Sequence, residues 1–185
     1  MRIISGTARG TKLYTLEGQT TRPTLDRVKE SLFNIIQNQI SNSVFLDLFS
    51  GSGAIGLEAA SRGAKKTYLC DKSKDAAKII KRNIEKTHLN EKVEFYNSDY
   101  ENLIRNKINE KLDIIYIDPP YESDFVSKSI KYIIEKDLVK EDSIIIIETD
   151  DKERILKEIE KIEVEVIDIR KYGRAALIFL KIRKG

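Results

Sequence analysis

Apolar positions along the chain alternate between two patterns. Short runs rich in β-branched residues indicate buried strands, and longer stretches with apolar residues every three or four positions indicate amphipathic helices. The predicted strands cover 44–48, 67–71, 93–97, 113–118, 143–148, 163–170 and 175–182. The predicted helices between the first five strands cover 54–63, 73–88, 99–108 and 124–136, and a further helix is predicted near 150–160.

The order of these elements predicts the fold. A strand followed by a helix, repeated at this spacing, is typical of a parallel sheet with helices on both faces. Residues 114–117 and 144–147 are continuous apolar runs, as expected of strands that are covered on both sides. Residues 171–174 leave no room for a helix between the last two strands, so those strands should pair antiparallel. We predict an α/β, three-layer, Rossmann-like fold with a mostly parallel seven-stranded sheet and a C-terminal antiparallel hairpin.

The segment ahead of the first strand has two patterns of its own. Apolar residues at 25, 28, 32, 35, 36 and 40 have helical spacing, and Pro23 suits a first helical turn. Before them, 2–5 and 11–16 have the pattern of a short β-hairpin. Because no repeat, linker or biased segment interrupts the chain, we predict a single domain over 1–185. It would comprise an N-terminal β-hairpin extension at 1–22 and a core at 23–185.

Composition narrows the class of protein. The 185 residues are 41% hydrophobic and 34% charged with few Gly and Pro, which argues against a disordered or collagen-like chain. The single cysteine excludes an internal disulfide and favours a reducing compartment. The single histidine argues against a His-rich metal site, and no 18-residue apolar stretch is present. We therefore expect a soluble, cytoplasmic protein that holds no metal.

Basic side chains gather at the two ends of the sequence. Residues 1–30 carry six basic and three acidic side chains, and residues 170–185 carry six basic and no acidic ones. Since the net charge is only +3, the middle of the chain is acidic. Basic ends around an acidic body fit a polyanion that contacts the termini, although ordinary solubilising Lys and Arg produce the same pattern.

A glycine-rich turn follows the first predicted strand. Gly51 and Gly53 begin the pattern G-x-G-x-x-G, in which backbone amides at the start of a helix can approach a ligand. Asp71 follows Gly51 by twenty residues, at the end of the second strand, where an acid can hold ribose hydroxyls. The pattern alone permits a nicotinamide-dependent enzyme, and a glycine-rich turn without a ligand would look the same.

Asp47 favours a different cofactor. It lies four residues before Gly51, where a carboxylate can meet an ammonium group that NAD lacks and S-adenosylmethionine carries. Asp99, with Tyr100 beside it, follows the third strand and could accept from an adenine amine, or it could merely cap the next helix. The predicted C-terminal hairpin also fits a protein that holds cofactor and substrate on a single sheet. It fits a dehydrogenase with two domains less well.

The fourth strand ends in the sequence Asp118-Pro119-Pro120-Tyr121. Proline fixes the backbone and lacks an N–H donor, while its carbonyl remains an acceptor. Asp118 and the Pro119 carbonyl could therefore accept both hydrogens of a planar amino group, and Tyr121 could stack on the attached ring. The alternative interpretation is a rigid turn with a surface tyrosine.

These motifs resemble the cofactor loop and the amino-methylating motif of class I S-adenosylmethionine-dependent methyltransferases. More narrowly, the chain resembles the bacterial RsmD family, which methylates the guanine N2 amine in 16S ribosomal RNA. The matching stretches are 2–6, 22–24, 26–28, 33–34, 46–53, 56–59, 61–64 and 118–121. The sequence departs from the family at 172–175, where an acid and a threonine more often follow the glycine.

The resemblance implies roles for individual residues. Cofactor contacts would come from Asp47, Phe49, Gly51, Ser52, Gly53, Asp71, Lys72, Asp99 and Tyr100. The target amine would be held by Asp118, Pro119, Pro120 and Tyr121, with Asp118 as an orienting acceptor rather than a strong base. Contacts to RNA phosphates would come from Arg9, Arg22, Thr24, Arg27 and Lys29.

The expected function is methyl transfer from S-adenosylmethionine to a guanine N2 amine of 16S ribosomal RNA, in an assembled or assembling small subunit. A DNA adenine or cytosine amino-methyltransferase shares the Asp-Pro-Pro-Tyr motif, but 185 residues leave little room for a target-recognition domain. A non-catalytic RNA-binding module need not keep Asp47, Asp71 and Asp118. A NAD-dependent oxidoreductase is the third alternative, which a cofactor titration would separate.

Overall fold

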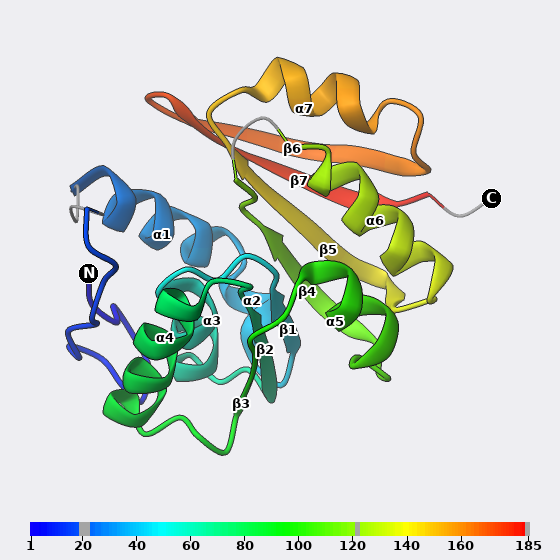
Figure 1. The fold of residues 1–185 in the computed structure, drawn as a ribbon. Coiled ribbons are helices and arrows are strands. Elements are labelled where there is room, and N and C mark those ends of the chain that lie inside the picture. The colour runs from blue at the N-terminus through cyan, green and yellow to red at the C-terminus, as the bar shows by residue number, and fades with distance from the viewer. Residues whose placement is uncertain (19–22, 121–122, 184–185) are drawn as a thin grey trace.

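The predicted alternation of strands and helices forms one seven-stranded sheet between two helical layers (Figure 1). The structure is a computed structural model that describes residues 1–18, 23–120 and 123–183, without the side chains of residues 23 and 24. The strands are β1 (Val44–Asp47), β2 (Lys66–Cys70), β3 (Val93–Tyr96), β4 (Leu112–Ile117), β5 (Val139–Thr149), β6 (Val164–Tyr172) and β7 (Ala175–Ile182). The helices are α1 (Pro23–Ile35), α2 (Gln37–Ile40), α3 (Ala54–Ser61), α4 (Lys74–Thr87), α5 (Tyr100–Asn106), α6 (Phe125–Glu135) and α7 (Lys152–Ile159).

The strand order is β3-β2-β1-β4-β5-β7-β6. The first five strands pair in parallel, and β7 pairs antiparallel with both β5 and β6, which confirms the predicted fold class and the C-terminal hairpin. After β1 the chain builds the sheet outward through β2 and β3, and then returns to place β4 on the other side of β1. Open α/β sheets bind ligands outside the carboxyl ends of the strands at such a switch point.

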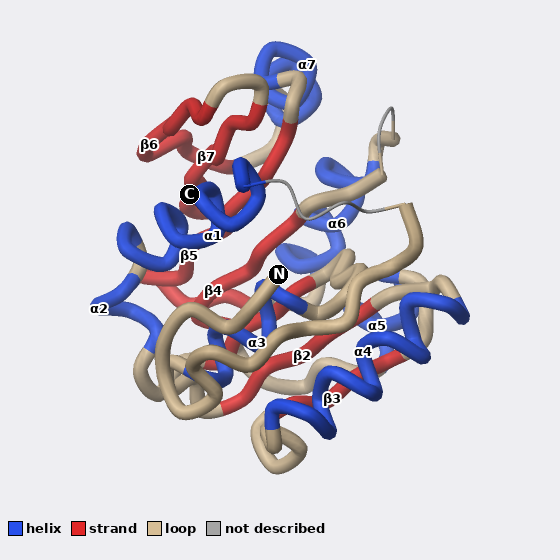
Figure 2. The backbone as a smooth tube through the Cα atoms, turned by 90° about the vertical axis from the view of Figure 1, so that its left-hand side faces the viewer, coloured by secondary structure: helices blue, strands red, loops and turns tan. Residues whose placement is uncertain are grey.

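Each face of the sheet has its own hydrophobic layer. Successive residues of a strand point to opposite faces, so Ile115 and Ile117 pack with α5, α6 and α7, whereas Ile114 and Tyr116 pack with α1 and α2. Helices α3 and α4 bury Leu57 and neighbouring apolar residues beside β2 on the same side as α1 (Figure 2). Among the described helices, none is both long and apolar enough to cross a lipid bilayer.

Close packing of α3 against the sheet depends on Gly56. A Cβ atom at this position would lie 2.0 Å from Leu69 Cδ2 and 3.3 Å from Asp47 Cβ, so a larger residue would force the Leu69 side chain or the helix to shift. Gly56 also donates its backbone N–H to Asp47 Oδ2 at 3.0 Å. The third glycine of the motif therefore fixes both the position of the helix and the carboxylate at the end of β1.

The N-terminal segment doubles back on itself in an antiparallel pairing that is shorter than the predicted β-hairpin of 2–5 with 11–16. The described part contains one isolated antiparallel bridge, between Arg2 and Lys12, and no strand. Ile3 N–H donates to the Thr11 carbonyl and Leu13 N–H to the Met1 carbonyl, each at 2.9 Å. The amides of Ile4 and Ser5 donate to the Glu58 carboxylate at 2.9 and 3.0 Å. The segment therefore forms a short antiparallel pairing and also docks on α3.

Candidate active site

A cavity of about 810 Å³ opens at the carboxyl ends of β1, β2, β4 and β5, where the strand order switches direction. Its volume lies in the range of about 300–1,000 Å³ that is usual for small-molecule sites. The predicted residues that line it are Asp47, Phe49, Gly51, Ser52, Asp71, Lys72, Asp99, Tyr100, Asp118, Pro119 and Pro120. Gly53 lies behind the wall with φ of 81° and precedes α3 as its N-cap residue. Tyr121 lies outside the described residues.

Asp47 places a buried carboxylate in the wall of this cavity. The residue is 1% exposed, and its Oδ1 atom has no hydrogen-bond partner among the described residues. Burial raises the pKa of Asp47 to about 7, with a smaller contribution from the charge of Asp71, while the Gly56 N–H opposes the shift. A ligand that brings a cation or an N–H donor would give this oxygen the partner that the protein lacks.

Asp47→Asn should raise the free energy of unfolding of the ligand-free protein near pH 8 and change it much less near pH 4. The folded carboxyl keeps its proton up to about pH 7, whereas an unfolded aspartate releases it near about 4. The folded wild type therefore binds more protons between these values, and its stability falls as the pH rises through this window. Urea unfolding at the two pH values measures the difference, and an equal effect at both would contradict the prediction.

Asp71 and Asp99 both make backbone contacts that shape the cavity. Asp71 accepts from Gly51 N–H and Ser73 N–H, each at 2.9 Å, and so ties the loop after β1 to the end of β2. Asp99 caps α5 by accepting from Asn102 N–H at 2.8 Å, which confirms the capping interpretation. A carboxylate oxygen has two lone pairs, so both residues can still accept from a ligand hydroxyl or amine.

An aromatic wall lies beside Asp99. Phe49 stacks on Phe125 with ring centroids 5.9 Å apart and an interplanar angle of 5°, and Tyr100 lies 4.9 Å from Phe125. Sequence reasoning found Phe49 and Tyr100 but missed Phe125, which lines the cavity from the first turn of α6. Its position just after the Asp-Pro-Pro-Tyr turn was the available signal. The wall suits a planar ring.

The cavity contains a second acidic residue beside Asp118 that sequence reasoning missed. Glu148, near the end of β5, lines the cavity and accepts a hydrogen bond from the Tyr116 hydroxyl. Enclosure by the protein, followed by the charges of Glu148, Asp47 and Asp150, raises the pKa of Asp118 well above its ordinary value, although this side chain opens onto solvent. Burial also raises the pKa of Glu148, while the hydrogen bond from Tyr116 lowers it. Within the described ranges, no three His, Cys, Asp or Glu side chains gather in a metal-binding arrangement.

The basic residues predicted to contact RNA have different surroundings. Arg9 in the N-terminal segment and Arg27 on α1 are exposed. Arg22 and the side chain of Thr24 lie outside the described residues. Lys29 is only 2% exposed, so the prediction that it contacts phosphate at the surface is wrong for this structure.

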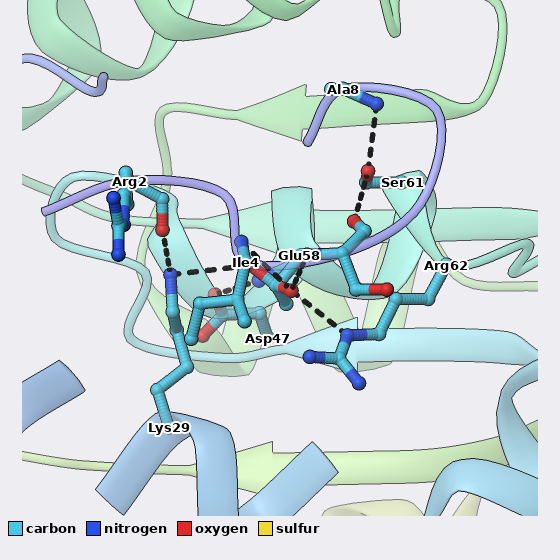
Figure 3. A network of polar contacts seen from close by, with 10 residues as sticks. Arg2, Ile4, Ala8, Lys29, Asp47, Glu58, Ser61 and Arg62 are labelled. Carbon is cyan, nitrogen blue, oxygen red and sulfur yellow. Dashed lines mark hydrogen bonds and ion pairs between the residues drawn. The ribbon is translucent and has the colours of Figure 1, made fainter. Parts of the chain in front are cut away.

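Lys29 belongs instead to a buried polar network (Figure 3). Its Nζ donates to the Arg2 carbonyl at 2.6 Å and pairs with Glu58 Oε2 at 3.3 Å. Glu58 is fully buried and also pairs with Arg62 at 2.8 Å. Burial lowers the pKa of Lys29, and the charge of Glu58 opposes that shift. The network therefore joins α1, α3 and the N-terminal segment, which together form one side of the cavity.

Comparison with known proteins places this site in a family. The family model described as conserved hypothetical protein 95 matches residues 1–181. The chain is 36% identical over 152 residues to the ribosomal RNA small subunit methyltransferase D of Haemophilus influenzae, covering 81% of this chain and 79% of the relative. The solved structure of yhhF from Escherichia coli matches with a TM-score of 0.82 at 25% identity, covering 100% of this chain and 99% of that one.

The fold itself extends to more distant proteins. A tRNA m1G37 methyltransferase of M. jannaschii matches with a TM-score of 0.65 at 24% identity, covering 90% of this chain and 50% of that one. At this identity the likeness shows the shared fold alone. The family match and the Haemophilus influenzae relative confirm the resemblance seen in the motifs. The chain therefore belongs to the conserved hypothetical protein 95 family, the family of the ribosomal RNA small subunit methyltransferase D proteins, and is a methyltransferase of that family.

Proposed function

We propose that this protein transfers a methyl group from S-adenosylmethionine to the exocyclic N2 amine of a guanine in 16S ribosomal RNA. The observation that carries the proposal is one cavity lined both by an unpartnered buried carboxylate, Asp47, and by the acceptor-rich turn at Asp118 and Pro119. The family supports ribosomal RNA as the substrate, since its Haemophilus influenzae member is named for the small subunit. We propose an assembled or assembling small subunit in the cytoplasm as the natural substrate, and residues 23–185 as the catalytic core.

The residues around the cavity fit this cofactor. The unpartnered Oδ1 of Asp47 suits an ammonium group, and Asp71 retains lone pairs for ribose hydroxyls. The wall formed by Phe49, Tyr100 and Phe125 suits an adenine ring. Bound S-adenosylmethionine would supply an electrophilic methyl carbon attached to a positively charged sulfur.

Asp118 and the Pro119 carbonyl would hold the nucleophile. The lone pair of an exocyclic amine is delocalised into the base, so two acceptors that take both amine hydrogens help to direct that lone pair toward the methyl carbon. The same acceptors stabilise the positive charge that grows on nitrogen as the N–C bond forms and the C–S bond breaks. The methylated nitrogen is acidic, and Asp118 with its raised pKa is better matched to accept the released proton than an ordinary aspartate.

Nucleoside mass spectrometry tests the proposal directly. The purified protein is incubated with isotopically labelled S-adenosylmethionine and, in parallel, with small-subunit particles, naked 16S RNA or duplex DNA. We expect labelled N2-methylguanine in RNA from at least one of the first two samples. Methyladenine or methylcytosine in the DNA, with no label in either RNA sample, would overturn the assignment in favour of a DNA amino-methyltransferase.

Arg9→Ala and Arg27→Ala should each weaken RNA binding and lower its dependence on salt. Both side chains are exposed, and a lost phosphate contact reduces the slope of log affinity against log salt by roughly 0.7–0.9. Lys136→Ala is the matched control, because Lys136 is exposed at the end of α6, where the chain turns back to start β5 away from the cavity. Filter binding at several salt concentrations measures the slopes. An unchanged slope for both arginine variants would remove these residues from the RNA interface.

A further inference from the structure

Glu148 is held beside Asp118 by the register of two parallel strands. Ile117 of β4 lies opposite Ile147 of β5. The residues that follow them, Asp118 and Glu148, therefore lie at the same level of the sheet. Tyr116 and Ile146, the preceding partners, pack under α1. Because side chains alternate between faces, Asp118 and Glu148 both point to that same side, where the cavity lies.

Tyr116 orients the Glu148 carboxylate. The tyrosine ring is buried, 2% exposed, and its hydroxyl donates to Glu148 Oε2. This bond uses one oxygen of Glu148, so Oε1 remains for a ligand. Lys29 and Lys72 also line the cavity, but the side chains that shift the pKa of Asp118 are acidic, and the one that shifts the pKa of Glu148 is Tyr116, through its hydroxyl.

A second observation in the same cavity points to a donor that comes from a ligand. Asp47 Oδ1 is buried, has no hydrogen-bond partner in the described part of the chain, and belongs to the same cavity wall. The cavity therefore presents acceptors at Asp47 as well as at Asp118 and Glu148. A base whose edge presents donors at both its amine and the adjacent ring nitrogen would match Asp118 and Glu148.

Of the three bases with an exocyclic amine, only guanine has such an edge. In guanine, the ring nitrogen next to the amine is N1, which carries a hydrogen. In adenine and cytosine the corresponding ring nitrogen, N1 or N3, presents a lone pair. A carboxylate next to Asp118 would accept from guanine N1–H, whereas it would face the lone pair of the other two bases at close range.

We propose that Glu148 determines base specificity by accepting a hydrogen bond from N1–H of the target guanine, while Asp118 and Pro119 hold the N2 amine. Tyr116 is the positioning residue for this contact. The proposal rests on the proposed function, guanine N2 methylation, and explains how the same Asp-Pro-Pro motif that serves other amino groups would select guanine here.

The test compares guanine with 2-aminopurine at the mapped target position of the RNA. 2-Aminopurine keeps the amine at C2 but has no hydrogen on N1. We expect the kcat/KM of the wild type to be roughly 10- to 100-fold higher for guanine than for 2-aminopurine. Guanine forms a hydrogen bond to a charged group, whereas 2-aminopurine leaves that carboxylate oxygen without a partner. Glu148→Ala should lower kcat/KM for guanine, because the partner of N1–H is gone. The ratio of the kcat/KM values for guanine and 2-aminopurine should then be close to one.

Two further variants keep the test decisive. Tyr116→Phe retains the buried ring and removes only the hydroxyl, so it should reduce the ratio in the same direction but by less. Asp150→Asn removes an exposed negative charge that also acts on Asp118, without removing a cavity-lining carboxylate, and should leave the ratio unchanged. Circular dichroism and cofactor titration verify that each variant is folded.

The outcomes separate this proposal from the proposed function. If the wild type methylates guanine and the ratio stays the same in both Glu148→Ala and Tyr116→Phe, the role of Glu148 is wrong while the proposed function stands. If Asp150→Asn lowers the ratio as much as Glu148→Ala, general negative charge rather than a specific acceptor selects the base, and the proposal also fails. If the wild type places no methyl on guanine N2 in any RNA, both proposals are overturned.

Discussion

Asp118→Ala should lower kcat for RNA methylation by roughly 10²–10³-fold, the usual cost of removing a group that stabilises charge developing in the transition state. The variant loses one of two acceptors for the amine hydrogens and the carboxylate whose raised pKa suits it to take up the proton. Single-turnover rates at saturating RNA measure the chemical step separately from substrate binding. Cofactor affinity, measured by calorimetry, should change far less, because the proposed cofactor contacts are Asp47 and the loop after β1 rather than Asp118.

Asp150→Asn is the matched control for this prediction. The substitution removes a negative charge that acts on Asp118. The Asp150 side chain itself is exposed and does not line the cavity. We expect it to turn over much faster than Asp118→Ala. Near-normal turnover by Asp118→Ala at saturating RNA would show that the carboxylate does not hold the amine.

Glu58→Gln should lower the free energy of unfolding by about 3–5 kcal/mol, the cost of breaking a buried ion pair by removing one partner. Lys29 is 2% exposed and, among the described residues, would keep the Arg2 carbonyl as its hydrogen-bond partner and Asp26 as a nearby opposite charge. The glutamine would also have to serve, with a single acceptor oxygen, the amides of Ile4 and Ser5 that the carboxylate accepts. Urea unfolding at neutral pH measures the loss.

Glu101→Gln provides the comparison for an exposed pair. Glu101 and Arg105 form an ion pair at 3.3 Å on α5 with both side chains about half exposed, and such pairs contribute roughly 0.3–0.5 kcal/mol. A loss of similar size in Glu58→Gln would mean that the buried network contributes little to stability. Lys29→Met should cost less than Glu58→Gln, because Glu58 keeps Arg62 and the amides of Ile4 and Ser5.

Most of the fold could be predicted because the period of apolar residues is a local property of the sequence. The five parallel strands and the closing hairpin lie where the β-branched runs predict them. The main difference among strands is β5, which begins at Val139 although its apolar run begins at Ile144. Val139 pairs with Leu112 across an irregularity in register, so backbone pairing extends the strand through polar residues that have no strand pattern.

The part of the site that sequence reasoning missed depends on partners far apart in the chain. Lys29 has the sequence pattern of a surface cation, and its burial is possible only because Glu58, from another helix, pairs with it. Glu148 is the last residue of a predicted strand. Only the register of that strand with β4 shows that Glu148 lies on the same side of the sheet as Asp118. The motif residues could be predicted because they lie close together in the sequence, within single turns, so their spacing alone indicates what they can bind.

The N-terminal pairing is shorter than the predicted hairpin for a related reason. Glycines and alternating apolar residues around positions 6 and 10 predict a turn, and the chain does turn there. The amides of Ile3 and Leu13 pair across the bridge, but those of Ile4 and Ala8 donate to the carboxylate of Glu58 and the hydroxyl of Ser61. Such distant acceptors cannot be recognised from the pattern of a single segment.

The docking of the first residues on α3 has a consequence for the order in which the chain folds. Ile4 and its acceptor Glu58 are separated by 54 positions, and Ala8 and Ser61 by 53. During synthesis from the N-terminus, residues 1–18 therefore leave the ribosome well before the helix that receives them, and Ile3, which ends fully buried, must wait in solvent. Closing such a loop becomes favourable only once the distant partner exists. The first part of the protein to be made can therefore take its final place only after α3 has been made, and the cavity has no wall on that side until then.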